Sequence, residues 1–277
     1  FVTNTLFVGK VYHRFAELAS TNDYAANLLA MDTTSPETAK SRPPEGTVVW
    51  ADSQSAGRGQ FGSRWESAAG QNLTLSIILY PDWLEIKDQF YLSMTIALAL
   101  IDTAKQQSGV PTAIPITAKW PNDLYLGNNK SGGILIQNSL SGNSWISAII
   151  GIGLNVNQSS FPDMQAQPTS LALAAGQTFD LDAVAETLFE CVERRYLQLK
   201  AGHRAEIQQE YENCLFRRGI PSDFQRPDGE IFQGMITGVH SDGRICIETT
   251  QGKELFGLKE VAFLTPSLTL PLKGKGT

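Results

Sequence analysis

The sequence predicts an α+β protein with a large amino-terminal domain and a small β-rich domain near its carboxyl end. In the first part of the chain, short apolar runs rich in β-branched residues are interspersed with helical patterns. After about residue 215 only short strand patterns separated by turn signals remain. The 277 residues suit either one large domain or one main domain with a small one. We expect a first domain over 1–213, a second over 214–266 and a loose tail over 267–277.

Helices are expected where apolar residues recur at helical spacing. A helix over 22–31 can be capped by Ser20 or Thr21. The run 88–107 predicts a largely buried helix, and 181–201 gives the clearest amphipathic pattern, followed by a further helix over 204–215. Strands are expected at 47–52, 73–81, 114–120, 130–140 and 144–156, the last two as a hairpin, and a Pro-rich loop at 32–46.

The carboxyl-terminal part carries turn sequences at close spacing. RPDGE, SDGR and TQGK separate short strand patterns, and Asp-Gly and Gln-Gly pairs are typical of tight hairpin turns. About fifty residues of this kind predict a small β-barrel or sandwich.

Composition excludes several classes of protein. The formal net charge of −6 without a basic run argues against general nucleic-acid binding, because phosphate neutralisation supplies most of that affinity. The three cysteines are widely spaced and form no metal or disulfide pattern, which favours reduced thiols in the cytoplasm. No apolar run is long enough for a transmembrane helix, and the first residues lack the pattern of a signal peptide.

The stretch GRGQFGSRW, residues 57–65, combines glycines, arginines and a tryptophan. Glycines let backbone N–H groups approach a ligand closely, and Arg58 and Arg64 offer forked donors to phosphate or carboxylate. Trp65 offers a flat apolar face. The stretch is neither a P-loop nor a dinucleotide-binding fingerprint. It predicts a loop that binds an anionic ligand, and the alternative is a surface loop with a buried tryptophan.

A second constellation lies in KWPNDLYLGNNKSGGILI, residues 119–136. Pro121 predicts a turn after a strand, with Asn122 and Asp123 following it. Lys119 and Lys130 bracket the carboxylate of Asp123, a set that can bind a nucleotide and its Mg²⁺. The alternative is a plain hairpin with surface lysines.

Two further segments place polar side chains at the end of a predicted strand and at the start of a predicted helix. GIGLNVN, 151–157, ends an apolar strand with two asparagines, which can donate to and accept from a ring or ribose. ASTND, 19–23, places hydroxyls at a helix start, where simple capping explains them equally well.

In this order the four segments resemble the biotin–protein ligases, also called biotin–[acetyl-CoA-carboxylase] ligases. The resemblance implies a mixed β-sheet catalytic domain with helices packed on it, the biotin/lipoate ligase fold, and a carboxyl-terminal SH3-like barrel. The matching residues are STN at 20–22, Q-x-x-GRG-x-x-G-x-x-W at 54–65, KWPND at 119–123, K-x-x-GIL at 130–135 and GIGLNVN at 151–157.

The family joins biotin to ATP as biotinyl-5′-AMP and then transfers biotin to one lysine of a biotin carboxyl carrier domain. The resemblance therefore implies ATP, Mg²⁺ and biotin as ligands and a carrier domain as partner. It implies catalytic roles for Arg58, Lys130, Lys119 and Asp123, with Asp123 also holding Mg²⁺. The implied biotin contacts are Ser20, Thr21, Asn22, Gln54, Gly57, Arg58, Gln60, Gly133 and Leu135, and the implied ATP contacts are Arg58, Gln60, Trp65, Asn122, Lys130 and Asn155.

Adenylation builds negative charge on phosphorus and on pyrophosphate, so the cations are expected to act electrostatically, without a nucleophilic side chain. Because the intermediate is a mixed anhydride that water hydrolyses, we expect residues 57–65 to close over it. A lipoate or octanoate ligase and a non-catalytic biotin or nucleotide sensor are the alternatives. No DNA-binding domain precedes the match, so no DNA binding is expected, and a monomer or a homodimer is expected.

The glycine-rich loop departs from the family pattern, because Gln60 and Ser63 replace two arginines and Arg64 lies one position later than the second. Gln60 brings a hydrogen bond but no charge. We predict weaker retention of the adenylate than in arginine-bearing relatives, measured as its dissociation rate. A slowly dissociating adenylate contradicts this prediction.

Overall fold

The structure, a computed structural model, describes residues 3–30, 42–142, 144–162 and 167–264. The expected tail at 267–277 and most of the expected loop at 32–46 lie outside these residues. The chain divides into two compact units between Phe216 and Arg217, three residues later than the expected boundary. Each unit is described by itself.

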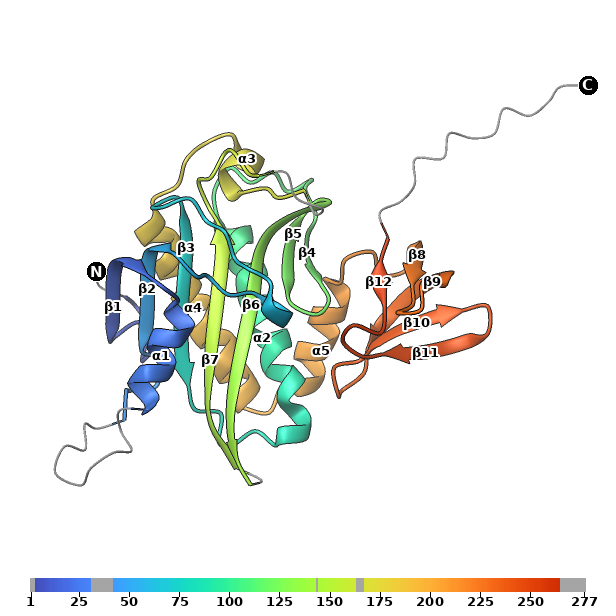
Figure 1. Cartoon of the computed structure of the whole chain (residues 1–277), viewed down its shortest axis with the longest axis horizontal. Helices are drawn as coiled ribbons and strands as arrows, with labels where there is room; N and C mark the ends of the chain where they lie inside the picture. Colours follow the sequence, from blue (N-terminus) through green and yellow to red (C-terminus); the bar gives the residue numbers. More distant parts are fainter. Residues whose placement is uncertain (1–2, 31–41, 143, 163–166, 265–277) are drawn as a thin grey trace, which may run out of the picture. The chain divides into compact units, whose positions relative to one another are not determined.

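The first unit is built on a seven-stranded mixed sheet with strand order β1-β2-β3-β7-β6-β5-β4. Strands β1 and β2 run parallel, and all other neighbours are antiparallel. The long hairpin of β6 and β7 crosses the middle of the sheet (Figure 1). The strands are β1 Tyr12–Leu18, β2 Val48–Gln54, β3 Asn72–Leu79, β4 Ile116–Lys119, β5 Asp123–Leu126, β6 Asn129–Ser141 and β7 Ser144–Asn155.

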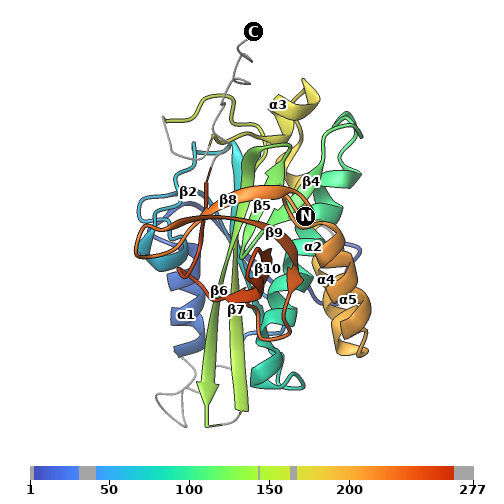
Figure 2. The ribbon, with the colours of Figure 1, turned by 90° about the vertical axis from the view of Figure 1, so that its right-hand side faces the viewer.

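Helices cover both faces of this sheet (Figure 2). Helix α2 (Gln89–Gln106) packs against α4 (Leu181–Lys200) and α5 (Arg204–Asn213), and apolar residues all around α2 fit its place between sheet and helices. On the other face α1 (Thr21–Ala30) buries Ala25 against Val49, Ile78 and Ile149. The sequence analysis does not predict the short helix α3 (Leu171–Ala175) or the strands β1 and β5, and it locates the other main helices and strands of this unit.

Strands β3 and β7 give the α1 side of the sheet an unusual composition. On β3 the buried polar residues Asn72, Thr74 and Ser76 alternate with leucines and isoleucine. Their partners on β7 are Asn155, Gly153 and Gly151 in turn. Because side chains alternate between the faces of a strand, this part of the α1 face is polar and carries no side chain at the two glycines, whereas the opposite face is apolar.

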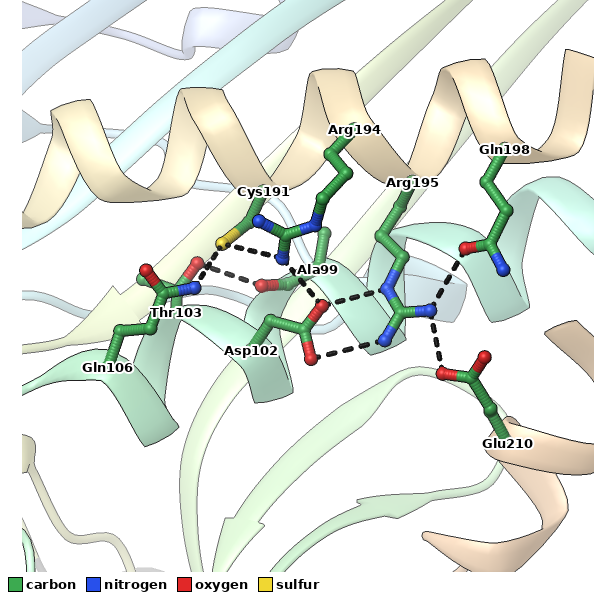
Figure 3. A network of polar contacts seen from close by, with 9 residues as sticks. All are labelled: Ala99, Asp102, Thr103, Gln106, Cys191, Arg194, Arg195, Gln198 and Glu210. Carbon is green, nitrogen blue, oxygen red and sulfur yellow. Dashed lines mark hydrogen bonds and ion pairs between the residues drawn. The ribbon is translucent and has the colours of Figure 1, made fainter.

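A network of charged side chains joins the three helices on the opposite face (Figure 3). The Asp102 carboxylate on α2 accepts from Arg195 at 2.7 and 3.2 Å and from Arg194 at 2.9 Å, and Arg195 also donates to Glu210 on α5 at 2.7 Å. Burial alone lowers the pKa of Arg195, but its hydrogen bonds to Asp102 and Glu210 outweigh that effect and raise the pKa. The network therefore fixes charged groups at a helix interface.

The second unit is a five-stranded antiparallel sheet with order β11-β10-β9-β8-β12. Phe224 is fully buried, and Phe232 stacks on it at 5.6 Å between ring centroids. Among the described residues no pairing joins the edge strands β11 and β12, so the expected closed barrel is not confirmed. The strands are β8 Pro221–Gln225, β9 Ile231–Val239, β10 Ile245–Thr249, β11 Gly252–Phe256 and β12 Ala262–Phe263.

Across the described ranges, no helix combines the length and the apolarity needed to cross a membrane.

Candidate functional site

A cavity of about 310 Å³ opens on the polar, glycine-containing face of the first unit's sheet. It collects residues from the start of α1, the end of β2, the glycine-rich loop, the turn between β4 and β5, and strands β6 and β7. The expected site residues that line it are Ser20, Thr21, Asn22, Gln54, Arg58, Gln60, Trp65, Asn122, Asp123, Lys130, Gly133 and Leu135.

Three expected site residues do not line this cavity. Gly57 lies at the base of the loop, where its backbone carbonyl accepts from the Trp65 amide at 3.1 Å. The Lys119 ammonium contacts the Tyr125 hydroxyl at 3.1 Å and lies 5.0 Å from the centre of the Tyr125 ring. Asn155 is buried and donates to the carbonyl of Thr169 at 3.0 Å. The spacing in the sequence does not distinguish these residues from the lining ones.

The start of α1 is held by hydrogen bonds to strands β2 and β6 and by its own N-cap. The Thr21 amide donates to Gln54 Oε1 at 2.8 Å, and the Asp23 amide donates to Ser20 Oγ at 3.3 Å, so Ser20 caps the helix as predicted. Asn22 Nδ2 donates to Gln137 Oε1 on β6 at 2.9 Å. These bonds hold Thr21 and Asn22 side by side at the cavity wall.

The two glycines of β7 provide room for the side chains that cover the sheet. A Cβ atom on Gly151 would lie 2.3 Å from Asn22 Oδ1, and one on Gly153 would lie 2.3 Å from the Trp65 ring. Real Cβ atoms do not approach other atoms so closely, so Asn22 and Trp65 can only occupy these places because both residues are glycine. The sequence GIGLN thus shapes the floor of the cavity.

The glycine-rich loop is folded into a small hairpin. Arg58 and Arg64 form an isolated antiparallel bridge, and the Gly59 amide donates to the Ser63 carbonyl at 2.7 Å. The tip is a tight turn in which Phe61 has φ of 55° and Gly62 has φ of 81°. The Ser63 hydroxyl donates to the Gln60 carbonyl at 2.7 Å. Ser63, which replaces a family arginine, therefore stabilises the turn.

Arg58 is ion-paired to α1. Its Nη1 lies 2.7 Å from Asp23 Oδ1, and both side chains are about half exposed, at 51% and 46%. Because Arg58 also lines the cavity, this pair connects the loop with the helix that carries Thr21 and Asn22. A guanidinium has five donors, so Arg58 can hold Asp23 and an anion together.

Lys130 and Asp123 form the second charged pair of the cavity. Lys130 Nζ lies 2.6 Å from Asp123 Oδ1, with 30% and 21% of the side chains exposed. Asn122 Nδ2 donates to the Ile134 carbonyl at 2.8 Å and so fixes the turn that carries Asp123. Residues 119–123 and 130–135, taken together in the sequence analysis, therefore meet as predicted, apart from Lys119.

The charges of the lining residues favour an anionic ligand. Arg58, Arg64 and Lys130 are cationic, and Asp123 is anionic. Trp65 covers part of the floor, and its buried Nε1 has no hydrogen-bond partner among the described residues. The described part of the chain contains no group of three or more His, Cys, Asp or Glu side chains that could hold a metal ion. Asp123 alone could supply a carboxylate to a Mg²⁺ ion whose other ligands are phosphate oxygens and water.

Sequence reasoning missed several residues of this site. Ser76 and Gln137 hold Asn22, while Gly151 and Gly153 make room for Asn22 and Trp65. The glycines are visible in GIGLN, but Ser76 looks like any polar position of an alternating strand. Only the pairing of β3 with β7 brings it beneath α1.

The mixed sheet and the charged cavity define a ligand-binding domain suited to a small anion and a ring system. Residues 29–155 match the Biotin/lipoate A/B protein ligase family. The chain therefore contains a domain of this family.

Individual relatives extend the match beyond these residues. The bifunctional ligase/repressor BirA of Bacillus subtilis is 33% identical over 222 residues, which are 79% of this chain and 66% of that protein. The chain thus spans just under two thirds of that relative. The biotin–[acetyl-CoA-carboxylase] ligase of Paracoccus denitrificans is 29% identical over 85% of this chain and 99% of its own length.

The fold has a counterpart among solved structures. The biotin protein ligase from Aquifex aeolicus in complex with biotin and ATP superposes with a TM-score of 0.71 at 24% sequence identity. The superposition covers 92% of this chain and 99% of that one. It confirms the predicted mixed-sheet fold of the catalytic domain.

Proposed function

We propose that this protein is a biotin protein ligase that attaches biotin to one lysine of a biotin carboxyl carrier domain. The observation that carries the proposal is the single cavity in which the α1 start, the Arg58 loop and the Lys130–Asp123 pair meet. The names of the relatives from Bacillus subtilis and Paracoccus denitrificans support it.

In the first half-reaction a biotin carboxylate oxygen attacks the α-phosphorus of ATP. A P–O bond forms, and the bond to the departing pyrophosphate breaks. Arg58 and Lys130 stabilise the negative charge that develops on phosphorus and on pyrophosphate. Lys130 reaches this charge by exchanging Asp123 for a phosphate oxygen, which frees the Asp123 carboxylate for Mg²⁺. The metal supplies further charge neutralisation when bound.

In the second half-reaction a lysine ε-amine of the carrier domain attacks the biotinyl carbonyl. The C–N bond forms as AMP leaves, and the amine loses a proton to solvent. The hairpin of residues 57–65 shields the anhydride from water until the lysine arrives. Its folded state in the structure supports this role.

Two finer features belong to the proposal. We expect the carboxyl-terminal unit to be an SH3-like barrel, supported by its five short antiparallel strands. A cytoplasmic location is supported by the absence of disulfides among the three cysteines, all of which are free thiols.

The test is a transfer assay. Purified protein is mixed with biotin, MgATP and a biotin carboxyl carrier domain, and the mass of the carrier is measured, with lipoate in a parallel reaction. We expect a biotin-sized mass increase that disappears with excess EDTA and in Arg58→Ala. Arg244→Ala, an exposed arginine of the second unit, is the matched control. Labelling with lipoate alone, or ligand binding without any transfer, overturns the proposal.

A further inference from the structure

Residues 66–71, between the glycine-rich hairpin and strand β3, run along the surface but are tied to the chain beneath them. All of their side chains are exposed or half-buried. Apolar packing therefore contributes little to the position of this segment, and hydrogen bonds hold it. Two of these bonds join backbone groups: the Gly70 amide donates to the Asp52 carbonyl at 2.9 Å, and the Asn157 amide donates to the Gln71 carbonyl at 2.8 Å.

The side chain of Gln158 holds the part of this segment that lies nearest to the hairpin. Gln158 is 7% exposed, and its Oε1 accepts from the Ala68 amide at 3.0 Å. The same oxygen accepts from Asn72 Nδ2 at 2.6 Å, and Gln158 Nε2 donates to the Ser160 carbonyl at 2.9 Å. Asn72 Nδ2 also donates to Ser67 Oγ at 2.9 Å. Because both ends of the Gln158 amide are bonded, its orientation is fixed.

Trp65 lies three residues before Ala68, so its position depends on this anchor. The Trp65 ring occupies the space that Gly153 on β7 leaves open, and its amide donates to the Gly57 carbonyl at 3.1 Å. Strand β7 thus forms the floor under the ring, and the segment directly after β7 anchors the backbone through Gln158. The described residues that line the cavity include Trp65 but not Gln158, so Gln158 acts on the cavity through Trp65.

We propose that Gln158 is a positioning residue that keeps the Trp65 ring over Gly153 and so lets the cavity retain its adenylate. This inference rests on the proposed function, in which the hairpin of residues 57–65 shields biotinyl-5′-AMP from water. While Gln158 holds Ala68, the hairpin can open only by motion of the residues before Ala68. Without this bond the whole arm can lift, and the Trp65 ring moves with it. Water then cleaves the exposed anhydride to biotin and AMP.

Asn157, the residue before Gln158, uses its side chain in the same way on a different segment. Asn157 Oδ1 accepts from the Phe179 amide and Asn157 Nδ2 donates to the Phe179 carbonyl, both at 2.8 Å. These bonds hold the chain just before α4, and the backbone bond from Asn157 to Gln71 does not depend on them. Loss of either side chain should destabilise the fold, but only loss of Gln158 should affect the adenylate.

The experiment compares Gln158→Leu, Gln158→Glu and Asn157→Leu with the wild type in the full chain. Biotin and radiolabelled MgATP are supplied, and two rates are measured: AMP release without carrier domain and biotin transfer with it. The readout is the ratio of release to transfer. We expect this ratio to rise about tenfold in Gln158→Leu, because a hydrogen-bonding group left without its partner changes a local equilibrium by roughly that factor.

The other two variants separate positioning from stability. In Gln158→Glu a carboxylate oxygen still accepts from Ala68 and Asn72, so the ratio should stay within about twofold of the wild type. Asn157→Leu should lower the free energy of unfolding in urea about as much as Gln158→Leu, since each loses a buried amide, but it should leave the ratio unchanged.

Tryptic cleavage after Arg64, identified by fragment mass, examines the hairpin without any ligand. We expect cleavage to be about threefold faster in Gln158→Leu and unchanged in Asn157→Leu, because trypsin cuts segments that open locally. If Gln158→Leu does not fold, Ala68→Pro removes the amide that Gln158 accepts from and leaves Gln158 in place. Both the ratio and the cleavage rate should then rise in Ala68→Pro.

Two results overturn the inference. One is an equal rise of the ratio in Gln158→Leu and Asn157→Leu, which a merely structural role for Gln158 predicts. The other is an unchanged ratio in Gln158→Leu although the wild type transfers biotin, and in that case the proposed function stands. If the wild type forms no adenylate at all, the proposed function fails and this inference fails with it.

Discussion

The two faces of the first unit's sheet carry polar networks of opposite character. On the helix-covered face, Asp102, Arg195 and Glu210 bond to one another across three helices (Figure 3). On the cavity face, Lys130 and Asp123 are paired, but Trp65 Nε1 is buried without a hydrogen-bond partner among the described residues.

This difference between the two faces suggests that one polar network serves the stability of the fold and the other serves ligand binding. A buried polar group that lacks a partner costs about 1–3 kcal/mol, and proteins rarely leave such groups without a reason. On the helix face Asp102, Arg195 and Glu210 satisfy one another within the protein, so we expect this network to act on stability. On the cavity face a ligand could supply missing partners and compete for the paired charges. Variants on the two faces should therefore affect different measurements.

The largest effect should come from Lys130 on the cavity face. Lys130→Ala removes a charge proposed to act on phosphate, and removal of one such group costs about 100- to 1,000-fold in rate, or roughly 2.7–4 kcal/mol. The measurement is the initial rate of biotin transfer to the carrier domain. Lys87→Ala, a lysine that is 73% exposed, is the matched control. A tenfold loss or less would remove Lys130 from the catalytic residues.

Asp102→Asn tests the helix face. Arg195 and Asp102 are only 13% and 16% exposed, so loss of the carboxylate charge should lower the free energy of unfolding by roughly 2 kcal/mol. Urea denaturation measures this change. The transfer rate of the folded variant should stay within twofold of the wild type, since this network lies across the sheet from the cavity. A large loss of transfer at unchanged stability would contradict the separation of the faces.

Gly153→Ala tests whether the position of the Trp65 ring above Gly153 matters for function. The added Cβ would lie 2.3 Å from the indole ring, so the ring must move and the hairpin of residues 57–65 with it. Overpacking of this kind costs about 1–3 kcal/mol. We expect the bound adenylate to be lost several-fold faster than in the wild type. The measurement is the rate at which radiolabelled AMP is released in the absence of the carrier domain. Gly142→Ala is the control, because nothing lies within 4 Å of its Cβ position; its own φ of 55° adds local strain only.

The smallest effect is expected for Asp23→Asn, which matches Asp102→Asn in chemistry but not in exposure. The Asp23–Arg58 pair is about half exposed, and such pairs contribute about 0.2–1 kcal/mol. Loss of the pair should loosen the hairpin and speed tryptic cleavage at Arg58 up to fivefold. The difference from wild type should shrink at high salt, because salt screens exposed charges. Equal cleavage of both proteins at low salt would exclude a role for the pair in holding the hairpin.

Much of the site could be read from the sequence because its parts are local. Ser20 at a helix start, the glycines and arginines of residues 57–65 and the pair Lys130 and Asp123 are short segments with distinctive residue types. Lys119 shows the limit of such reading: it has the same charge as Lys130 and lies closer to Asp123 in sequence, but its side chain contacts Tyr125. Spacing along a chain does not fix the direction of a long side chain.

The sequence by itself determined most of the helices and strands of the first unit, the resemblance to the family and most of the residues that line the cavity, since periodicity and turn chemistry act over a few residues. Only the tertiary structure decided what lies beneath them. Ser76 reaches Asn22 because β3 pairs with β7 in a register that places Gly151 opposite it. Register is a property of strands far apart in the chain, so no local pattern contains it.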